Sequence, residues 1–251
     1  MEFKLINQII YERKLEWVQK TRDYDAFCKP VYALKDDELI HLGSAVFTKY
    51  KTRKFLITAA HVLEECKNSS STFCIIANNQ IIEILGGLYH GTLSEDPLDF
   101  AWLEVNIKEG ILYQEKFIEL FSYNQLGGDN RLYMALGYPN SKNKVSIATK
   151  LANPKLISYS SSARHEEDFI FVDYEKENCI RNGAKVNSPD LKGMSGGPLF
   201  DLGDLGNIKN HIQQPAPRLA GIIIEHNLHS KTIRCTKINT IFSDIDRVLN
   251  L

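Results

Sequence analysis

Several features that would assign the chain to a common class are absent from its sequence. No apolar run approaches the roughly 18 residues that a membrane span needs. The 30 basic residues balance 31 acidic ones, so the composition lacks the basic excess that is typical of nucleic-acid binding. The N-terminal segment carries charges inside its apolar stretch and has no small-residue cleavage site, unlike a secretory signal peptide. We therefore expect a cytoplasmic protein that binds neither membrane nor nucleic acid.

Cysteine is scarce, and its arrangement does not suggest a disulfide framework. The five cysteines form an odd set without C-x-x-C spacing: Cys28, Cys66, Cys74, Cys179 and Cys235. We expect them to be reduced and buried as small hydrophobic residues. His226 and His229 resemble a metal-binding pair, but no carboxylate or cysteine lies at ligand spacing from them. We therefore expect no metal and no other cofactor.

Short runs of β-forming residues dominate the chain from about residue 30 to residue 237. The hydrophobic fraction of 43% supports a full core and argues against disorder. About six candidate strands lie on each side of a polar, glycine-rich stretch at 124–130, a pattern typical of two consecutive β-barrels. The candidates are Val31–Leu34, Ile40–Tyr50, Lys54–Ala59, Phe73–Ala77, Gln80–Leu85 and Phe100–Val105, then Leu132–Leu136, Val145–Leu151, Leu156–Tyr159, Phe169–Tyr174, Pro198–Asp201, Leu219–Ile224 and Thr232–Lys237.

Both ends of the chain have amphipathic patterns that predict helices. Apolar residues recur at roughly helical spacing within residues 2–20, and the final apolar residues are spaced as i, i+4, i+7 and i+8, at Ile241, Ile245, Val248 and Leu249. We expect an all-β fold of two six-stranded antiparallel β-barrels with a helix at each end. The expected division is an N-terminal amphipathic helix at 1–25, a first barrel at 26–123, a second barrel at 124–237 and a C-terminal helix at 238–251.

A serine among glycines is the first candidate for chemistry. The segment reads Gly193-Met194-Ser195-Gly196-Gly197-Pro198. Glycines allow close backbone approach and positive φ, so the amides of Gly193 and Ser195 could point into one small concavity. Two such N–H groups beside a hydroxyl form an oxyanion site for acyl transfer. An ordinary Gly/Ser/Pro turn is the alternative, because such clusters are common in loops.

A catalytic serine needs a base, and the base needs a third group to orient it. His61 follows an apolar run whose last two residues are alanines, which leave space beside an imidazole. Asp99 opens an apolar strand, where a partly buried carboxylate needs a donor such as the imidazole Nδ1–H. Asp96 competes for this role, but it precedes Pro97 in a more polar turn. Taken singly, His61 could be a core histidine and Asp99 a strand cap.

Together these segments resemble the trypsin/chymotrypsin-like serine peptidases. The resemblance rests on Thr58-Ala59-Ala60-His61, Asp99-Phe100-Ala101 and Gly193-Met194-Ser195-Gly196-Gly197-Pro198, which have the order and similar separations of the family. It covers roughly residues 30–250. It implies that catalytic His61, Asp99 and Ser195 meet in a cleft between two barrels, and that the amides of Gly193 and Ser195 hold the oxyanion.

The chain departs from the family pattern in three respects. Met194 stands where zymogen-activated relatives carry an aspartate, and no Ile-Val-Gly-Gly-like start is present, so we expect no such activation switch. In this the chain resembles the stress proteases and the staphylococcal-type relatives. Ile224 stands where many relatives carry a serine that supports the triad aspartate, which weakens the expected support of Asp99. A cystine framework is not obvious.

The resemblance also indicates where a substrate would bind. The segments at 188–192 and 224–227 would line the specificity pocket, and the expected substrate-binding residues are Pro189, Lys192, Ile224, Glu225 and His226. Pro189 replaces the acidic residue that selects basic side chains, so we do not expect a strict trypsin-like preference. His226 or Arg234 could favour an acidic side chain and Glu225 a basic one, although each could also be a rim residue.

The combined expectation is an intracellular, bacterial-type serine endopeptidase that cleaves protein or peptide substrates through an acyl-enzyme. A cytoplasmic protease with an intact triad needs restraint, so we expect a regulatory partner protein to gate it. A bacterial defence module that pairs such a peptidase with a sensor would fit. The alternatives are a non-catalytic protein-binding module with the same fold and an esterase that uses the same triad.

Overall fold

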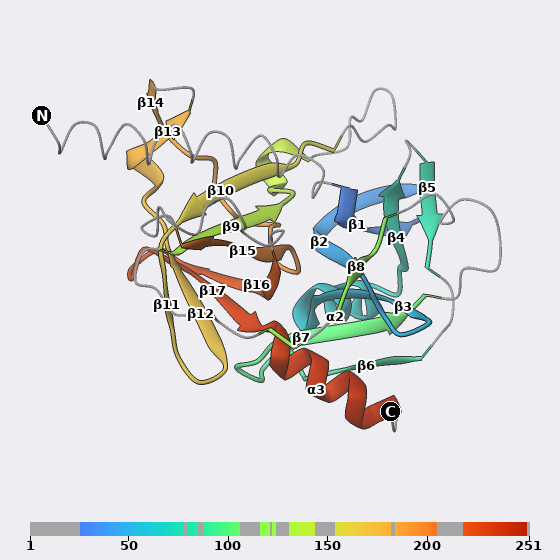
Figure 1. Cartoon of the computed structure of the whole chain (residues 1–251). Helices are drawn as coiled ribbons and strands as arrows, with labels where there is room; N and C mark the ends of the chain where they lie inside the picture. The colour runs from blue at the N-terminus through green and yellow to red at the C-terminus, as the bar shows by residue number, and fades with distance from the viewer. Residues whose placement is uncertain are drawn as a thin grey trace, which may run out of the picture.

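The computed structural model forms two β-sheets that lie side by side (Figure 1). It describes residues 26–77, 80–84, 88–105, 116–120, 122–123, 131–143, 154–181, 184–204 and 218–249. The helix expected at 1–25, the linker at 124–130 and the strand expected at Val145–Leu151 lie outside these residues. The four-part division of the chain therefore stays a prediction.

The first sheet contains the strands up to residue 119. Its elements are β1 (Cys28–Lys35), β2 (Glu38–Tyr50), β3 (Arg53–Ala59), β4 (Thr72–Ala77), β5 (Gln80–Glu83), β6 (Tyr89–Gly91), β7 (Phe100–Glu104) and β8 (Ile118–Glu119). The strand order is β5-β4-β1-β2-β3-β7-β6, with antiparallel neighbours throughout. The two-residue strand β8 pairs with β2 in parallel.

The second sheet follows with the same kind of pairing. Its elements are β9 (Arg131–Gly137), β10 (Ile157–Ser161), β11 (Ala163–His165), β12 (Phe169–Asp173), β15 (Pro198–Asp204), β16 (Arg218–Asn227) and β17 (Thr232–Lys237). The order is β10-β9-β15-β16-β17-β12-β11, again antiparallel. A separate hairpin joins β13 (Cys179–Arg181) to β14 (Ala184–Val186), and short 3₁₀ turns occupy η3 (Asn140–Lys142) and η4 (Lys176–Asn178).

Both sheets repeat one topology. In the described part of the chain, each sheet contains six strands of four or more residues, and β6, β8 and β11 are shorter additions. Numbered from one to six along the chain, the long strands follow the cyclic order 1-2-3-6-5-4 in both sheets, read in opposite directions along the two strand orders given above. The prediction of a trypsin-like double β-barrel built from two six-stranded antiparallel sheets is confirmed.

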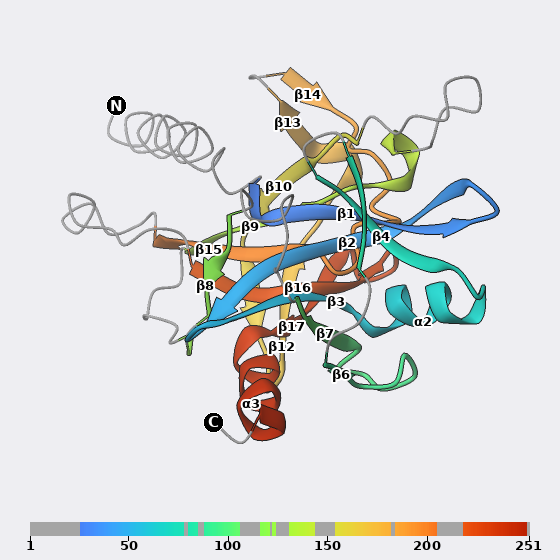
Figure 2. The same cartoon turned by 90° about the vertical axis from the view of Figure 1, so that its right-hand side faces the viewer.

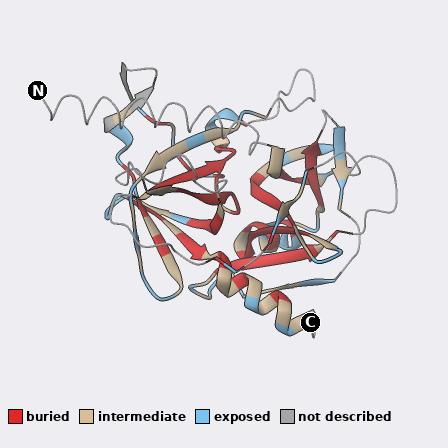
Figure 3. Ribbon diagram, in the orientation of Figure 1, coloured by how far each residue is buried: buried red, intermediate tan, exposed pale blue. Residues whose placement is uncertain are grey.

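The two sheets share a core. One buried cluster joins Phe55 and Trp102 of the first sheet to Leu199 and Phe200 of the second, and Figure 3 shows that buried residues are concentrated in the strands of both sheets. Each of these four residues is fully buried. Complete burial of one such side chain contributes about 1.5–3 kcal/mol. Because the cluster includes both sheets, apolar packing holds the barrels in one arrangement.

All five cysteines are free, as expected for reduced thiols. Four are buried, and Cys179 is only partly so, which corrects the expectation of burial at that position. Burial is the main reason that the pKa of Cys74 is raised to about 12. Such a thiol stays protonated at neutral pH and is a poor nucleophile.

Two α-helices are described, and the sequence predicts only the second. α2 (Ala60–Asn68) begins directly where β3 ends, whereas the sequence suggests only a strand end with His61 after it. α3 (Ile238–Leu249) follows β17 as predicted, with Ile241 and Ile245 buried. Within the described residues, neither helix has the length and apolar character needed to cross a membrane.

α3 continues from β17 of the second sheet and lies at the lower edge of the molecule in Figure 2. Its Asp244 side chain is hydrogen-bonded to two residues of the first sheet. Asp244 accepts hydrogen bonds at Oδ2 from Trp102 Nε1 at 2.9 Å and from His90 Nδ1 at 2.8 Å. Its other oxygen pairs with Arg247. Burial acts to raise the pKa of Asp244, but the hydrogen bonds from Trp102, Arg247 and His90 outweigh it, so the pKa is lowered.

Replacing Asp244 with alanine should lower the free energy of unfolding by about 2–3 kcal/mol, because the buried Trp102 indole N–H then lacks its acceptor. Urea denaturation at pH 7 measures this loss, and Ser243→Ala on the exposed face of α3 is the control. The lowered pKa means that the stabilisation is present above the unfolded-state pKa and is lost as pH falls through the folded-state pKa. An equal loss in both variants would show that Asp244 is not the anchor.

Candidate active site

Asp99 caps the helix that carries His61. The first N–H groups of a helix have no partner within it, and Ala59 at the N-cap position has no side chain that could accept them. Here Ala60 N–H donates to Asp99 O at 3.1 Å, and His61 N–H donates to Asp99 Oδ1 at 3.0 Å. A residue 38 positions further along the chain therefore satisfies the start of α2.

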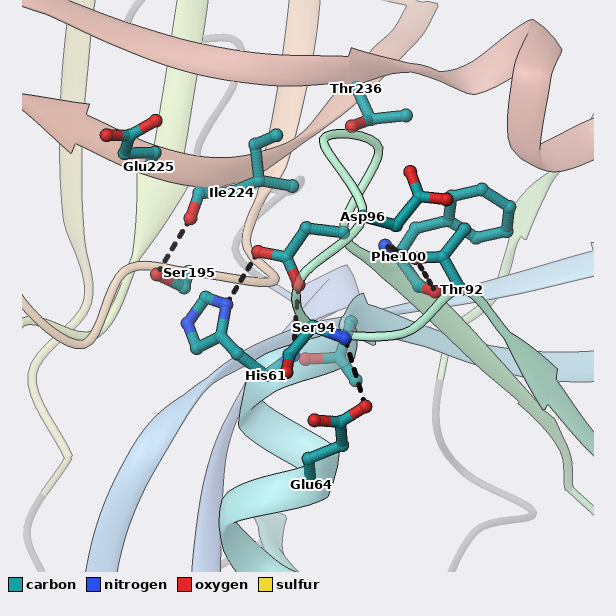
Figure 4. A network of polar contacts seen from close by, with 12 residues as sticks. His61, Glu64, Thr92, Ser94, Asp96, Phe100, Ser195, Ile224, Glu225 and Thr236 are labelled. Atoms are coloured by element: carbon teal, nitrogen blue, oxygen red, sulfur yellow. Dashed lines mark hydrogen bonds and ion pairs between the residues drawn. The ribbon is translucent and has the colours of Figure 1, made fainter.

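The same carboxylate orients the imidazole. Asp99 Oδ2 lies 2.6 Å from His61 Nδ1 (Figure 4). An ionised carboxylate only accepts hydrogen bonds, so Nδ1 carries the proton and Nε2 keeps its lone pair in the neutral ring. The Asp99 side chain is 11% exposed and that of His61 is 38% exposed, so the pair is partly shielded but open on the imidazole side. In this arrangement the carboxylate orients the imidazole, whose Nε2 can act as a base.

Two opposing effects set the pKa of His61. Burial is the largest and lowers it, because charging a ring that is shielded from water is unfavourable. The hydrogen bond and the negative charge of Asp99 raise it and, with smaller contributions from Glu65 and Glu64, outweigh burial. The pKa of His61 is therefore raised above its ordinary value of about 6.5.

Asp99 has an unusual backbone conformation. Its φ is +41°, in the left-handed region that aspartate enters more readily than most residues. This conformation costs about 1–2 kcal/mol for a residue with a Cβ. Asp96 shapes the turn: its backbone O accepts Asp99 N–H at 3.1 Å, and its Oδ1 accepts Leu98 N–H at 2.8 Å. Of the two carboxylates that the sequence offers, Asp99 contacts the imidazole and Asp96 forms the turn.

The loop that carries Ser195 packs against the strands that lead to His61. Ser44 of β2 donates from its backbone N–H to Ser195 O at 2.8 Å and from Oγ to Gly193 O at 3.0 Å. Gly196 has a φ of +86°, and a Cβ there would lie 2.0 Å from Ser44 O and 2.2 Å from Thr58 Oγ1. Only glycine permits this approach. Second-barrel Ser195 is thus brought to the end of β3, two residues from His61.

The part of the chain that the structure describes contains no acceptor for the two amides expected to bind an oxyanion. Within the described residues, no hydrogen bond uses the N–H of Gly193 or Ser195. A planar trans peptide points its N–H opposite its C=O, so a fixed carbonyl also fixes the next amide. The carbonyls are fixed by Asn140 N–H to Lys192 O at 2.7 Å and by Gly197 N–H to Met194 O at 2.9 Å. The orientation of both amides is therefore set by the backbone.

Ser195 and His61 are not hydrogen-bonded to each other in this structure. Ser195 Oγ donates to Ile224 O at 3.5 Å, and within the described residues the hydrogen bond of the His61 ring goes to Asp99 (Figure 4). A contact of 3.5 Å is at the outer limit of a hydrogen bond and is weak. Catalytic hydrogen bonds are often loose before a substrate binds. Rotation about χ1 of Ser195 is the movement that would redirect its hydroxyl.

The expected pocket residue Ile224 contributes little side-chain surface. The residue is 3% exposed, and it packs in the apolar cluster of the first barrel, although β16 belongs to the second. The backbone carbonyl of Ile224 is the group that contacts Ser195. Any contact of this residue with a substrate would therefore use its backbone.

Two expected substrate-binding residues, Pro189 and His226, lie together around Tyr174. The Tyr174 hydroxyl donates to Pro189 O at 2.8 Å, and its ring lies 4.7 Å from the His226 ring at an interplanar angle of 83°. Burial is the main reason that the pKa of His226 is lowered, so this imidazole is neutral at pH 7. Tyr174 is not among the predicted site residues, because its only sequence signal is its place at the end of an apolar run.

The other expected pocket residues, Lys192 and Glu225, are exposed. Lys192 N–H donates to Asp190 Oδ1 at 3.1 Å, and the Glu225 carboxylate pairs with Arg234 Nε at 3.3 Å. The opposite charges of Glu225 and Arg234 offset each other, which weakens either as a selector of charged side chains. Within the described residues, no three histidine, cysteine or acidic side chains gather as a metal site would require.

Comparison with known proteins shows the fold of this chain but does not show its activity. No family model and no curated protein matches the sequence, whereas 548 chains of solved structures match the coordinates. A structure of GrC is 16% identical, with 90% of this chain and 95% of that chain covered and a TM-score of 0.57.

Two viral structures belong to the same group of matches. A structure that concerns coupled folding and binding of the intrinsically disordered Sesbania mosaic virus VPg protein is 16% identical, with coverage of 86% and 94% and a TM-score of 0.51. A human pathogenic astrovirus serine protease is 12% identical, with coverage of 84% and 89% and a TM-score of 0.47. The two matches with TM-scores of 0.57 and 0.51 show a shared fold at 16% identity, and a shared fold by itself does not assign a reaction.

The contact between Asp99 and His61 can be tested without measuring any activity. Asp99→Asn keeps an oxygen for the backbone of α2 but removes the negative charge, so the pKa of His61 should fall below its wild-type value. NMR titration of the His61 ring measures the shift. Asp96→Asn keeps the turn acceptor and should leave the His61 pKa unchanged. A His61 pKa that is insensitive to Asp99→Asn would contradict the pairing.

Proposed function

We propose that the protein is a serine endopeptidase in which His61, Asp99 and Ser195 form a catalytic triad. The observation that carries this proposal is the Asp99–His61 pair, which is accompanied by a serine loop whose two amides have a fixed orientation. The fold alone does not carry the proposal, because one fold can host many unrelated reactions. The site has one element for each step of acyl transfer: a nucleophile, a held base and an oxyanion site.

The geometry supports the following acylation step. Ser195 Oγ bonds to the carbonyl carbon of the scissile peptide while His61 Nε2 takes the hydroxyl proton. The carbonyl oxygen becomes an oxyanion and accepts hydrogen bonds from the amides of Gly193 and Ser195. Collapse breaks the C–N bond, and His61 gives its proton to the leaving amine. An ester between Ser195 and the substrate acyl group remains.

Deacylation repeats these roles with water as the nucleophile. His61 takes a proton from water, the resulting oxygen bonds to the acyl carbon, and the same two amides hold the oxyanion. The ester C–O bond then breaks, Ser195 recovers its proton from His61 and the carboxylic acid leaves. Asp99 stabilises the imidazolium in both halves and stays ionised.

The Ser195–Ile224 contact has a consequence for regulation. The proposed reaction needs Ser195 Oγ to turn from the Ile224 carbonyl toward His61 Nε2. Binding of a substrate, or of the regulatory partner protein that we expect, can favour this rotamer. The partner, its place in a defence module and a cytoplasmic location stay predictions, as does the pocket formed by Pro189, Lys192, Ile224, Glu225 and His226.

A fluorophosphonate probe tests the nucleophile. Wild-type protein should be labelled, and Ser195→Ala should lose the label together with on the order of 10⁶-fold of any peptidase turnover. Ser162→Ala, an exposed serine in the second barrel, should keep both. A wild-type protein that neither labels nor cleaves peptides, alone or with candidate activators, would favour the binding-module alternative. Hydrolysis of esters without peptides would favour the esterase.

The pH dependence tests the base. His61 must be neutral to accept a proton, so kcat/KM on a peptide substrate should rise with pH. The apparent pKa should lie above about 6.5, because Asp99 raises the pKa of His61. Initial rates between pH 5 and 9, buffered at constant ionic strength, give this value. An acid limb centred below the ordinary histidine value would rule out the Asp99-held imidazole as the base.

A further inference from the structure

The turn that carries Asp99 is held more tightly than a surface turn needs to be. Asp99 lies in the left-handed backbone region, and such a conformation persists only where its surroundings determine it. The peptide before Asp99 is held through Asp99 N–H, which donates to Asp96 O. The peptide after it is held through Asp99 O, which accepts Ala60 N–H, and through Phe100 N–H, which donates to Thr92 Oγ1 at 3.0 Å.

The carbonyl of the peptide between Leu98 and Asp99 is held by a residue of the second barrel. Leu98 O accepts a hydrogen bond from Thr236 Oγ1 at 2.5 Å. Thr236 is fully buried in β17, where its backbone pairs with Ile222 and Phe169 on either side. Figure 4 shows Thr236 on a strand of the second sheet, next to the turn that bears Asp96. The N–H and the C=O of both peptides that flank Asp99 are therefore hydrogen-bonded.

This contact answers a question that the sequence leaves open. Ile224 lacks the hydroxyl with which a serine at that position would support the acid, and its side chain is buried among apolar residues. The Asp99 carboxylate is held by His61, through ring and backbone. Support from the second barrel reaches the acid through its backbone, by way of Leu98.

We propose that Thr236 is a positioning residue for Asp99, with its hydroxyl holding the Leu98–Asp99 peptide and thereby the carboxylate against His61. The inference rests on the proposed function and adds a group from the second barrel to it. Ser195 also belongs to the second barrel, so Thr236 ties the position of the acid to the barrel that carries the nucleophile. In the opposite direction, Ser44 of the first barrel ties down the Ser195 loop.

The experiment compares Thr236→Val with Thr236→Ser. Valine matches threonine in shape but leaves Leu98 O without its donor, whereas serine keeps the hydroxyl. Thr236→Val should lower kcat about 10- to 100-fold with little change in KM, because a small misplacement of a catalytic group has effects of this size. Thr236→Ser should stay within about threefold of wild type.

A second measurement separates positioning from stability. The pKa of His61, measured by NMR, should fall in Thr236→Val and stay at the wild-type value in Thr236→Ser. Thr232→Val is the matched control, because Thr232 is also buried in β17 but its hydroxyl contacts Ser230. It should leave both kcat and the His61 pKa unchanged, whatever its effect on the melting temperature.

The outcomes distinguish this inference from the proposed function. An active wild type, with kcat and His61 pKa unchanged in Thr236→Val, would overturn the role of Thr236 and leave the peptidase assignment intact. A wild type without activity would overturn that assignment, while the His61 pKa would still report whether Thr236 positions the acid. If Thr236→Val does not fold, a comparison of Thr236→Ala with Thr236→Ser tests the same hydroxyl. Thr236→Ala should then lower both kcat and the His61 pKa relative to Thr236→Ser, and equal values in the two variants would overturn the inference.

Discussion

The carboxylate of Asp99 is the group on which the site depends. One oxygen binds the imidazole of His61 and the other binds the backbone N–H of the same residue, so ring and helix are oriented together. A single contact of either kind would leave the ring or the start of α2 free to move. Burial lowers the pKa of His61, but the hydrogen bond and the charge of the largely buried Asp99 carboxylate outweigh it and raise the pKa above the ordinary value.

The two barrels hold each other's functional segments. Ser44 of the first barrel is fully buried and holds the Ser195 loop through its N–H and its hydroxyl, which also accepts Tyr138 N–H at 2.9 Å. Thr236 of the second barrel reaches the Asp99 turn. A shared apolar core fixes the barrels as bodies, and these polar contacts fix the segments that face each other. The proposed acyl transfer requires that catalytic groups from different barrels keep fixed relative positions.

The fold and the site carry different information. Many chains of solved structures match this one, and two that share its fold are each 16% identical to it. A fold so widely shared constrains where a site can lie and says little about its reaction. The proposal of a peptidase rests instead on the imidazole that Asp99 holds and on the two oriented amides, and it requires Ser195 Oγ to turn from Ile224 toward His61.

Local patterns in the sequence were sufficient to predict the two groups of strands, the C-terminal helix and the contact of His61 with Asp99 rather than Asp96. Alternation, helical spacing and a carboxylate at a strand start are all properties of neighbouring residues. They were insufficient for α2, whose first N–H groups are capped from 38 residues away. They also missed Tyr174 beside His226 and Thr236 beside Leu98, where the partners are 52 and 138 positions apart. Contacts of this kind depend on the path of the folded chain, so only the tertiary structure decides them.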